Sequence, residues 1–218
     1  MTETLERRTV GEELAARLRR KILVGELPPD RALPEAALAE EYAVSRPSVR
    51  DALRRLAHEG LVRHETHRGA RVASLSDDEL RDVLLVRTIV EPEVVRRFGL
   101  PEELGTRLSA CVEQLEASAA AQDWPAYGEA DIHFHETLVA AARSSRLSET
   151  HGRAMRQLRL HFVSVDQREQ RLATDRRHVG EHRRIADLLA ADEREAAACL
   201  LLKHLEDARA ALVATASG

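Results

Sequence analysis

The chain has 218 residues, enough for one large domain or two small ones. Hydrophobic residues make up 44% and charged residues 32%, a balance that argues against a wholly disordered chain. Only 3% of the residues are aromatic, and Ala, Leu, Arg and Glu dominate, so we expect a mainly helical fold. The net charge of −4 averages a mildly basic first third and an acidic remainder, which suggests that one end meets a polyanion.

The number of cysteines and the length of the apolar runs indicate in which cellular compartment the protein lies. The two cysteines, Cys111 and Cys199, are too few for a disulfide framework, which favours a reducing environment. The N-terminal segment has no apolar signal-peptide core, and no stretch approaches 18 uninterrupted apolar residues. We therefore expect a cytoplasmic protein that has no contact with a membrane.

Residues 1–75 have the element order of a winged helix-turn-helix domain. Helices are predicted at about 10–24, 34–42 and 46–58, and short strands at 61–65 and 70–73. The connection between the second and third helices is three residues long, which allows only a tight corner. Ser45 is a suitable N-cap for the third helix, and Pro47 falls in its first turn.

The candidate DNA-binding residues lie on the third helix and at the tip of the hairpin: Arg46, Ser48, Arg50, Arg54, Arg68 and Gly69. Arg46 and Arg50 lie about one turn apart and suit bidentate contacts with guanine in a major groove. Ser48 suits a phosphate contact, and Gly69 lets the hairpin approach a sugar–phosphate backbone closely. The alternative interpretation of the arginines is a solvated helix face, as in most charge runs.

Two segments of this domain, AEEYAVSRPSVRDAL at 39–53 and LAHEGLV at 56–62, closely resemble the N-terminal domain of GntR-family bacterial transcription regulators. The resemblance implies binding to a double-stranded DNA operator. Two positions depart from the family pattern. Asp30 stands where the loop after the first helix usually has glycine, and Ala36 stands where some relatives have a DNA-contacting arginine. We therefore expect that contact to be absent and the operator preference to differ.

Residues 76–218 predict a six-helix antiparallel bundle, with helical runs at about 77–98, 101–122, 124–143, 146–167, 174–191 and 193–215. Ser76 and Glu79 form a capping box at the start of the first of these helices. Seven of the ten histidines lie beyond residue 132, so this second domain also holds most of the candidate metal ligands.

Asp131 and His135 are four residues apart, so their side chains emerge from one face of a helix. His182 and His204 lie beside apolar stripes of other helices, and a shared metal would give their ring nitrogens a partner. A set of three histidines and one carboxylate suits Zn²⁺, Ni²⁺, Mn²⁺ or Fe²⁺. From spacing alone, isolated hydrogen-bonded histidines are the alternative, and His178 is a competing ligand.

Four segments of the second domain are similar to the signatures of the FCD effector domain of the FadR-type GntR branch: 87–92 (RTIVEP), 131–138 (DIHFHETL), 181–185 (EHRRI) and 203–205 (KHL). The resemblance implies a divalent metal, Zn, Ni or Mn, held by the Asp and three His named above. It also implies a small organic-acid effector at the open metal positions. The helix count resembles the VanR-like subgroup, whereas Ser144 and Ser145 replace a common asparagine.

Arg87 is the candidate second anchor for the effector, because a guanidinium binds a carboxylate bidentately. Its alternative role is a structural salt bridge with Glu91, four residues later. Together these features predict a homodimeric regulator, more often a repressor than an activator in this family. Its effector would select one arrangement of the two winged helices. The alternatives are a metal-dependent enzyme, for which no general base is evident, and a regulator that senses the metal itself.

Overall fold

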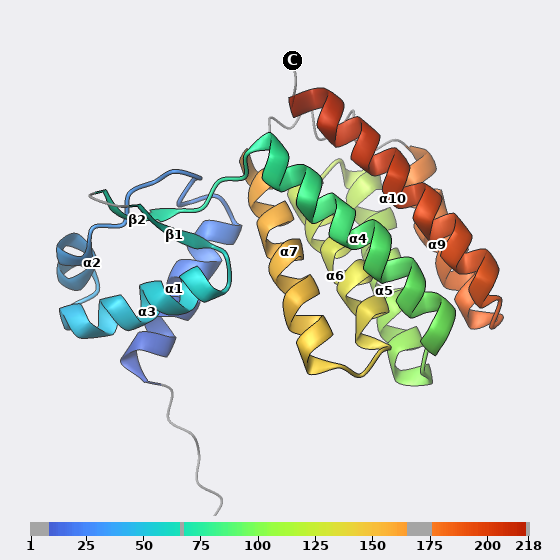
Figure 1. Cartoon of the computed structure of the whole chain (residues 1–218), viewed down its shortest axis with the longest axis horizontal. Coiled ribbons are helices and arrows are strands. Elements are labelled where there is room, and N and C mark those ends of the chain that lie inside the picture. The colour runs from blue at the N-terminus through green and yellow to red at the C-terminus, as the bar shows by residue number, and fades with distance from the viewer. Residues whose placement is uncertain (1–8, 66–67, 165–175, 217–218) are drawn as a thin grey trace, which may run out of the picture. The chain divides into compact units, whose positions relative to one another are not determined.

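The computed structural model describes residues 9–65, 68–164 and 176–216. The chain divides into two compact units, Met1–Ser74 and Leu75–Gly218. In the described ranges the first unit combines helices with a hairpin, and the second is helical (Figure 1). The predicted fold class, a winged helix-turn-helix followed by a helical bundle, is confirmed. Within these ranges, no helix combines the length and the apolar character needed to cross a membrane.

The first unit contains α1 (Val10–Leu23), α2 (Glu35–Glu41), α3 (Arg46–His58), β1 (Val62–Glu65) and β2 (Gly69–Val72). The two strands are antiparallel, with Val62 opposite Val72. Helix α3 packs against α1, α2 and β1, and its buried side carries Leu53 and Leu56. The apolar side of α3 thus holds the unit together and leaves the arginine-bearing side exposed.

Two turns in the first unit require a left-handed backbone. Ala43 lies in the corner between α2 and α3 with φ of 52°, and Asp30 has φ of 64°. Asp and Asn enter this region more readily than other non-glycine residues. The Asp30 side chain also accepts hydrogen bonds from Arg63 and from the Ser74 hydroxyl. These contacts explain why this chain tolerates Asp30 in place of the usual glycine.

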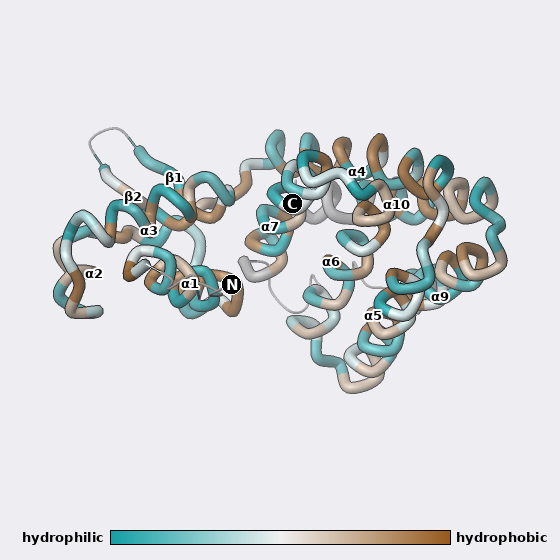
Figure 2. The backbone as a smooth tube through the Cα atoms, turned by 90° about the horizontal axis from the view of Figure 1, so that it is seen from below, coloured by the Kyte–Doolittle hydropathy of each residue, from teal (hydrophilic) through white to brown (hydrophobic). Residues whose placement is uncertain are grey.

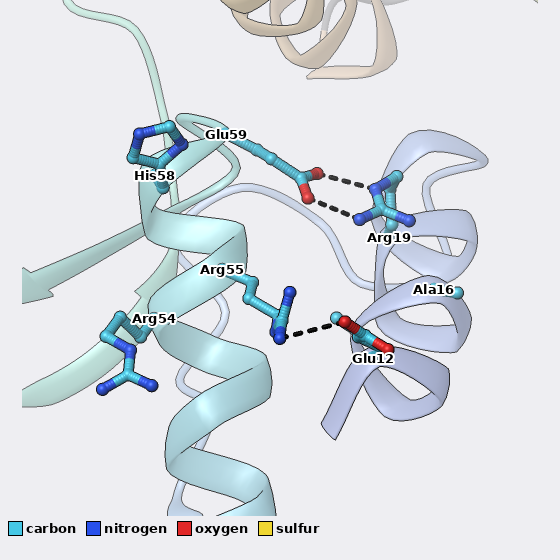
Figure 3. Close-up of a pocket in the computed structure, with 8 residues that line it drawn as sticks. Glu12, Ala16, Arg19, Arg54, Arg55, His58 and Glu59 are labelled. Carbon is cyan, nitrogen blue, oxygen red and sulfur yellow. Dashed lines mark hydrogen bonds and ion pairs between the residues drawn. The ribbon is translucent and has the colours of Figure 1, made fainter. Parts of the chain in front are cut away.

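Ion pairs join α1 to α3 and to the residue that follows it, Glu59, across an open groove of about 760 Å³ (Figure 3). Arg19 Nε lies 2.6 Å from Glu59 Oε2, and Arg55 Nη2 lies 3.1 Å from Glu12 Oε1. Both pairs are partly exposed, so each contributes little to stability by itself. They fix the orientation of α1 relative to the helix that carries the candidate DNA contacts.

The second unit contains α4 (Asp77–Phe98), α5 (Glu102–Ala121), α6 (Trp124–Ala140), α7 (Ser145–Ser164), α9 (Arg176–Ala190) and α10 (Arg194–Ala216). These helices lie within a few residues of the predicted runs, apart from 165–167 and 174–175, which fall outside the described residues. Helix α4 packs against α6, α7 and α10, and α5 packs against α6 and α9. Hydrophobic and hydrophilic residues alternate along these helices (Figure 2), and the buried apolar side chains form two clusters inside the bundle.

Helix α6 lies between two apolar clusters of the bundle. Its Phe134 and Leu138 belong to one cluster with residues of α5, α9 and α10. Its Ile132 belongs to another with Leu84 of α4 and Met155 of α7. His135, which lies between these positions on α6, is therefore buried among neighbouring helices.

The turn between α6 and α7 replaces the common asparagine without losing a helix cap. Arg143 takes a left-handed conformation with φ of 49°. The Ser144 hydroxyl then accepts a hydrogen bond from the Leu147 amide at 3.3 Å. Because serine is a good N-cap, this bond satisfies one of the free amides at the start of α7.

Candidate metal centre

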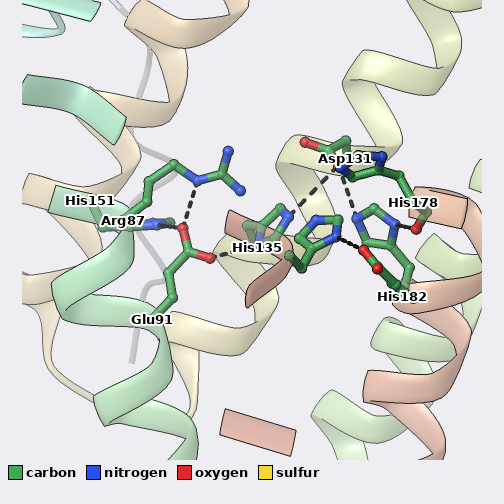
Figure 4. A network of polar contacts seen from close by, with 9 residues as sticks. Arg87, Glu91, Asp131, His135, His151, His178 and His182 are labelled. Carbon is green, nitrogen blue, oxygen red and sulfur yellow. Dashed lines mark hydrogen bonds and ion pairs between the residues drawn. The ribbon is translucent and has the colours of Figure 1, made fainter. Parts of the chain in front are cut away.

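The four predicted metal ligands lie together in the second unit. Asp131 and His135 come from α6, His182 from α9 and His204 from α10. One donor atom of each lies within 4.8 Å of the corresponding atoms of the other three. His182 Nε2 is 3.0 Å and His135 Nε2 is 3.7 Å from Asp131 Oδ1 (Figure 4). The structure therefore brings together, from three helices, donors that the sequence separates by up to 73 residues.

Each histidine of the set is oriented through its Nδ1 atom: His135 by Glu91 Oε2 at 2.6 Å, His182 by the His178 carbonyl at 2.7 Å and His204 by Glu181 Oε2 at 3.0 Å. A carbonyl only accepts, so Nδ1 of His182 carries the proton and its Nε2 has a free lone pair when the ring is neutral. Metal-ligating histidines are usually held in this way by a carboxylate or carbonyl on the second nitrogen.

The second ring nitrogen, Nε2, lacks a hydrogen-bond partner in two of these histidines. The Nε2 atoms of His135 and His182 are buried and form no hydrogen bond, although Asp131 lies near both. Leaving a buried polar atom unsatisfied costs about 1–3 kcal/mol. A divalent ion among the four side chains would satisfy both nitrogens and the Asp131 carboxylate. The donor set thus fits a metal of the kind that accepts imidazole and carboxylate ligands.

The electrostatics of the set keep two of its donors, Asp131 and His204, in metal-binding forms. Burial by itself would raise the pKa of Asp131, but its interactions with His135 and with His182 hold the pKa well below its usual value. Burial lowers the pKa of His204 to about 3, against the opposing effect of Glu181. Asp131 is therefore a carboxylate and His204 a neutral imidazole at neutral pH.

Glu91 links the four-residue set to α4 and α7 through a buried network (Figure 4). Its Oε1 accepts from Arg87 Nε at 2.8 Å and lies 2.9 Å from His151 Nε2, while its Oε2 lies against His135. The predicted salt bridge between Arg87 and Glu91 is present, with side chains 3% and 0% exposed. The Nη2 atom of Arg87 is also buried and has no hydrogen-bond partner, so the salt bridge leaves part of the guanidinium free for another anion.

Sequence reasoning did not find His151, the metal-facing role of Glu91, or Glu181. His151 lies on α7, 60 residues from Glu91, and no spacing pattern connects them. The only signal for Glu91 was its separation of four from Arg87. His178, the predicted competing ligand, lies with Glu181 and His204 in a second group of donors within 4.8 Å. In this structure it holds His182 through its backbone carbonyl instead.

The candidate DNA-binding side chains lie on the outer surface of the first unit. Arg50, Arg54 and Arg68 are 65%, 78% and 76% exposed. Arg46 and Gly69 are also exposed, whereas Ser48 is half-buried and contacts the Ser45 hydroxyl at 2.9 Å. The hairpin tip at 66–67 lies outside the described residues.

Arg50 and Arg54 both have acidic neighbours. Arg50 Nε lies 2.7 Å from Glu35 Oε2, and Arg54 Nη2 lies 2.6 Å from Asp51 Oδ1. Exposed ion pairs contribute roughly 0–1 kcal/mol, so phosphates or base edges can compete for both guanidinium groups. The exposed side of α3 thus presents a row of arginines whose ion pairs within the chain are weak.

Comparison with known proteins agrees with this architecture. Residues 10–72 match the model of the bacterial regulatory proteins of the gntR family, and residues 82–207 match the FCD domain. The gluconate operon transcriptional repressor of Bacillus licheniformis is 35% identical over 65% of this chain and 58% of its own length. The galactonate operon transcriptional repressor of Escherichia coli is 30% identical over 63% of this chain and 69% of its own length.

A solved structure of a GntR-type regulator from Rhodococcus sp. RHA1 is also similar. It has a TM-score of 0.82 and 30% identity, and the alignment covers 94% of this chain and 97% of that one. A winged helix joined to this helical domain defines a class of bacterial transcription regulators rather than of enzymes. The chain belongs to the gntR family, in the branch that carries an FCD domain. It spans 58% of the Bacillus licheniformis relative's length.

Proposed function

We propose that this chain is an operator-binding transcription repressor whose DNA affinity is controlled by a small carboxylate bound at a divalent metal ion. The observation that carries the proposal is the convergence of four donor side chains, two of which, His135 and His182, have a buried nitrogen without a hydrogen-bond partner. Residues 1–75 bind DNA, and residues 76–218 bind the metal and effector and form the homodimer. As a bacterial DNA-binding protein, the regulator acts in the cytoplasm.

The metal is Zn, Ni or Mn, and its ligands are Asp131, His135, His182 and His204. Three imidazoles and one carboxylate leave coordination positions open if the geometry is octahedral. The bound ion supplies a positive centre for an anionic ligand. Arg87 is the second anchor, since its buried Nη2 has no protein partner and lies in the network that reaches His135 through Glu91.

In the DNA complex, Arg46 and Arg50 reach base edges in the major groove, because they lie near the N-terminus of the exposed side of α3. The backbone contacts come from Ser48, Arg54, Arg68 and Gly69. Gly69 has φ of 77° and open space at its Cβ position, so only the backbone conformation requires glycine there. The operator has two-fold symmetry, because the regulator binds as a homodimer.

The effector is proposed to be a small organic acid, and sugar acids are the first class to test. Two relatives are named as repressors of gluconate and galactonate operons. Such acids offer a carboxylate for the metal and Arg87, together with hydroxyl groups for the surrounding polar residues. The alternative, in which the metal itself is the signal, predicts that metal removal alone releases the operator.

The metal assignment is tested by the metal content of purified protein after saturation with Zn²⁺ and desalting. Wild type is expected to retain one ion per chain at this set and His182→Ala to lose it. The control is His133→Ala, because His133 is exposed on the same α6 helix and lies outside the set. Equal metal content in wild type and His182→Ala would contradict the ligand assignment.

A further inference from the structure

His178 on α9 has an imidazole ring that the candidate metal centre does not use. Its backbone carbonyl accepts from His182, and its side chain lies near His182 (Figure 4). Both ring nitrogens are buried, and neither has a hydrogen-bond partner among the residues that the structure describes. Buried polar groups of folded proteins normally have partners, so this ring indicates a ligand that protein atoms do not supply.

Two further donors lie beside the His178 ring. Glu181 comes three residues later, so the two side chains share one face of α9. His204 comes from α10, which packs against α9, and its ring centroid is 5.2 Å from that of His178. One donor atom of each of the three lies within 4.8 Å of those of the other two. We call these three residues the outer set, and the four candidate metal ligands described above the inner set.

The donor types and spacing of the outer set suit Zn²⁺. Two imidazoles and one carboxylate are common zinc ligands, and bonds of about 2.0–2.2 Å in a tetrahedral site place the ligand atoms roughly 3.4 Å apart. His204 Nδ1 and Glu181 Oε2 are already 3.0 Å apart. The third donor, on His178, therefore needs a shift of roughly 1.4 Å or less, which side-chain rotation provides.

His204 belongs to both sets, but its ring can serve only one of them at a time. Its Nδ1 faces Glu181, which leaves Nε2 for the inner set. A neutral imidazole offers one lone pair, because its other nitrogen carries the proton. An ion in the outer set takes the lone pair of Nδ1, so the proton resides on Nε2 and the inner set loses one of its ligands.

We propose that His178, Glu181 and His204 form a second Zn²⁺ site, which competes with the inner set for His204. Neither set is sealed from solvent, since the Glu181 side chain is 12% exposed and that of Asp131 is 14% exposed. Excess Zn²⁺ therefore draws His204 away from the inner ion and makes the inner site sensitive to the zinc concentration. That consequence rests on the proposed function, whereas the outer site itself does not.

The test is equilibrium dialysis against Zn²⁺ of full-length Asp131→Ala/His182→Ala, which lacks two inner ligands but keeps the outer set. We expect it to bind one ion per chain, and the further change His178→Ala to weaken that binding about tenfold or more. The matched control adds His133→Ala instead, since His133 is exposed and belongs to neither set. Circular dichroism checks the helices, and Asp131→Asn/His182→Gln, which keeps more side-chain volume, is the background to use if the first one unfolds.

The same dialysis of wild type tests the shared ligand. Its second ion should bind about tenfold or more weakly than the ion of Asp131→Ala/His182→Ala, because His204 already serves the inner ion. Failure of that variant to bind Zn²⁺, or an equal Kd with and without His178→Ala, would overturn the outer site. An equal Kd for the second ion of wild type and the ion of the variant would overturn the competition. The inner set is judged separately on desalted protein, since an outer ion held by three ligands is expected to leave during desalting.

Discussion

At the scale of single residues, Glu91 has the largest number of roles in the candidate site. It is fully buried and contacts Arg87, His135 and His151 through its two carboxylate oxygens. Burial alone would raise the pKa of Glu91, but Arg87 and His135 hold it well below its usual value. Glu91 is therefore an ionised carboxylate that accepts from all three neighbours at once.

Replacing Glu91 with glutamine should weaken metal binding without removing a ligand. A glutamine turns an NH₂ group towards one of three donors, so His135 loses the partner that orients it. We expect the metal affinity of Glu91→Gln to fall roughly 10–100-fold, measured by competition with a chelator. Glu113→Gln on the exposed side of α5 is the control. Unchanged affinity in Glu91→Gln would show that Glu91 does not orient His135.

A second prediction at this scale concerns the helix-turn-helix corner. Ala43 has φ of 52°, a conformation that costs a non-glycine residue about 1–2 kcal/mol. Ala43→Gly removes that strain, partly offset by the larger conformational freedom of the unfolded chain. We expect the first unit to gain up to about 1 kcal/mol, measured by hydrogen exchange of the α1 and α3 amides. Ala57→Gly, inside α3, should lose about 1 kcal/mol instead. Destabilisation by both changes would refute the explanation.

At the scale of elements, most helix boundaries follow from local chemistry. Ser76 is the N-cap of α4: its hydroxyl accepts from the Glu79 amide while the Glu79 carboxylate accepts from the Ser76 amide. Ser45 is the N-cap of α3, and its hydroxyl accepts from the Ser48 amide, with Pro47 in the first turn of the helix. Both starts were predicted from sequence, since the residues that decide them are at most three apart.

The capping box of α4 gives a prediction at this scale. Ser76→Ala should lower the free energy of unfolding of the second unit by about 1 kcal/mol, because the Glu79 amide loses the hydroxyl that accepts from it. Ser76→Asp should keep most of the stability, since aspartate also caps. Urea unfolding followed by the fluorescence of Trp124, the one tryptophan of the chain, measures both. Equal losses in the two variants would contradict the capping explanation.

The site itself was only partly predictable from sequence. The pairing of Asp131 with His135 could be predicted from their spacing, because a helix brings residues four apart to one face. His182 and His204 show only as histidines beside apolar stripes, and the family resemblance was needed to select them. The contact between His151 and Glu91 depends on the packing of α7 against α4, for which neither residue carries a local signal.

At the scale of the whole molecule, the chain joins a unit with exposed arginines to a unit with a buried polar centre. The basic first third of the sequence corresponds to the first unit. The acidic remainder, with seven of the ten histidines after residue 132, corresponds to the second unit. Helix α4 follows the winged unit in the chain and contributes Arg87 and Glu91 to the network. Because Glu91 of α4 contacts His135, the candidate metal centre is in direct contact with the helix that follows the DNA-binding unit in the chain.

The central claim is that ligand binding at the metal centre controls the affinity of the winged unit for DNA. The most direct measurement is the operator Kd, by fluorescence anisotropy, of Zn²⁺-loaded wild type and of His182→Ala, with and without gluconate or galactonate. The operator is first selected from genomic fragments with the wild-type protein. The account predicts that both proteins bind this DNA, and that one of the acids shifts the Kd of wild type about tenfold while leaving His182→Ala unchanged. An equal shift in both proteins, or no shift in wild type with either acid, would contradict it.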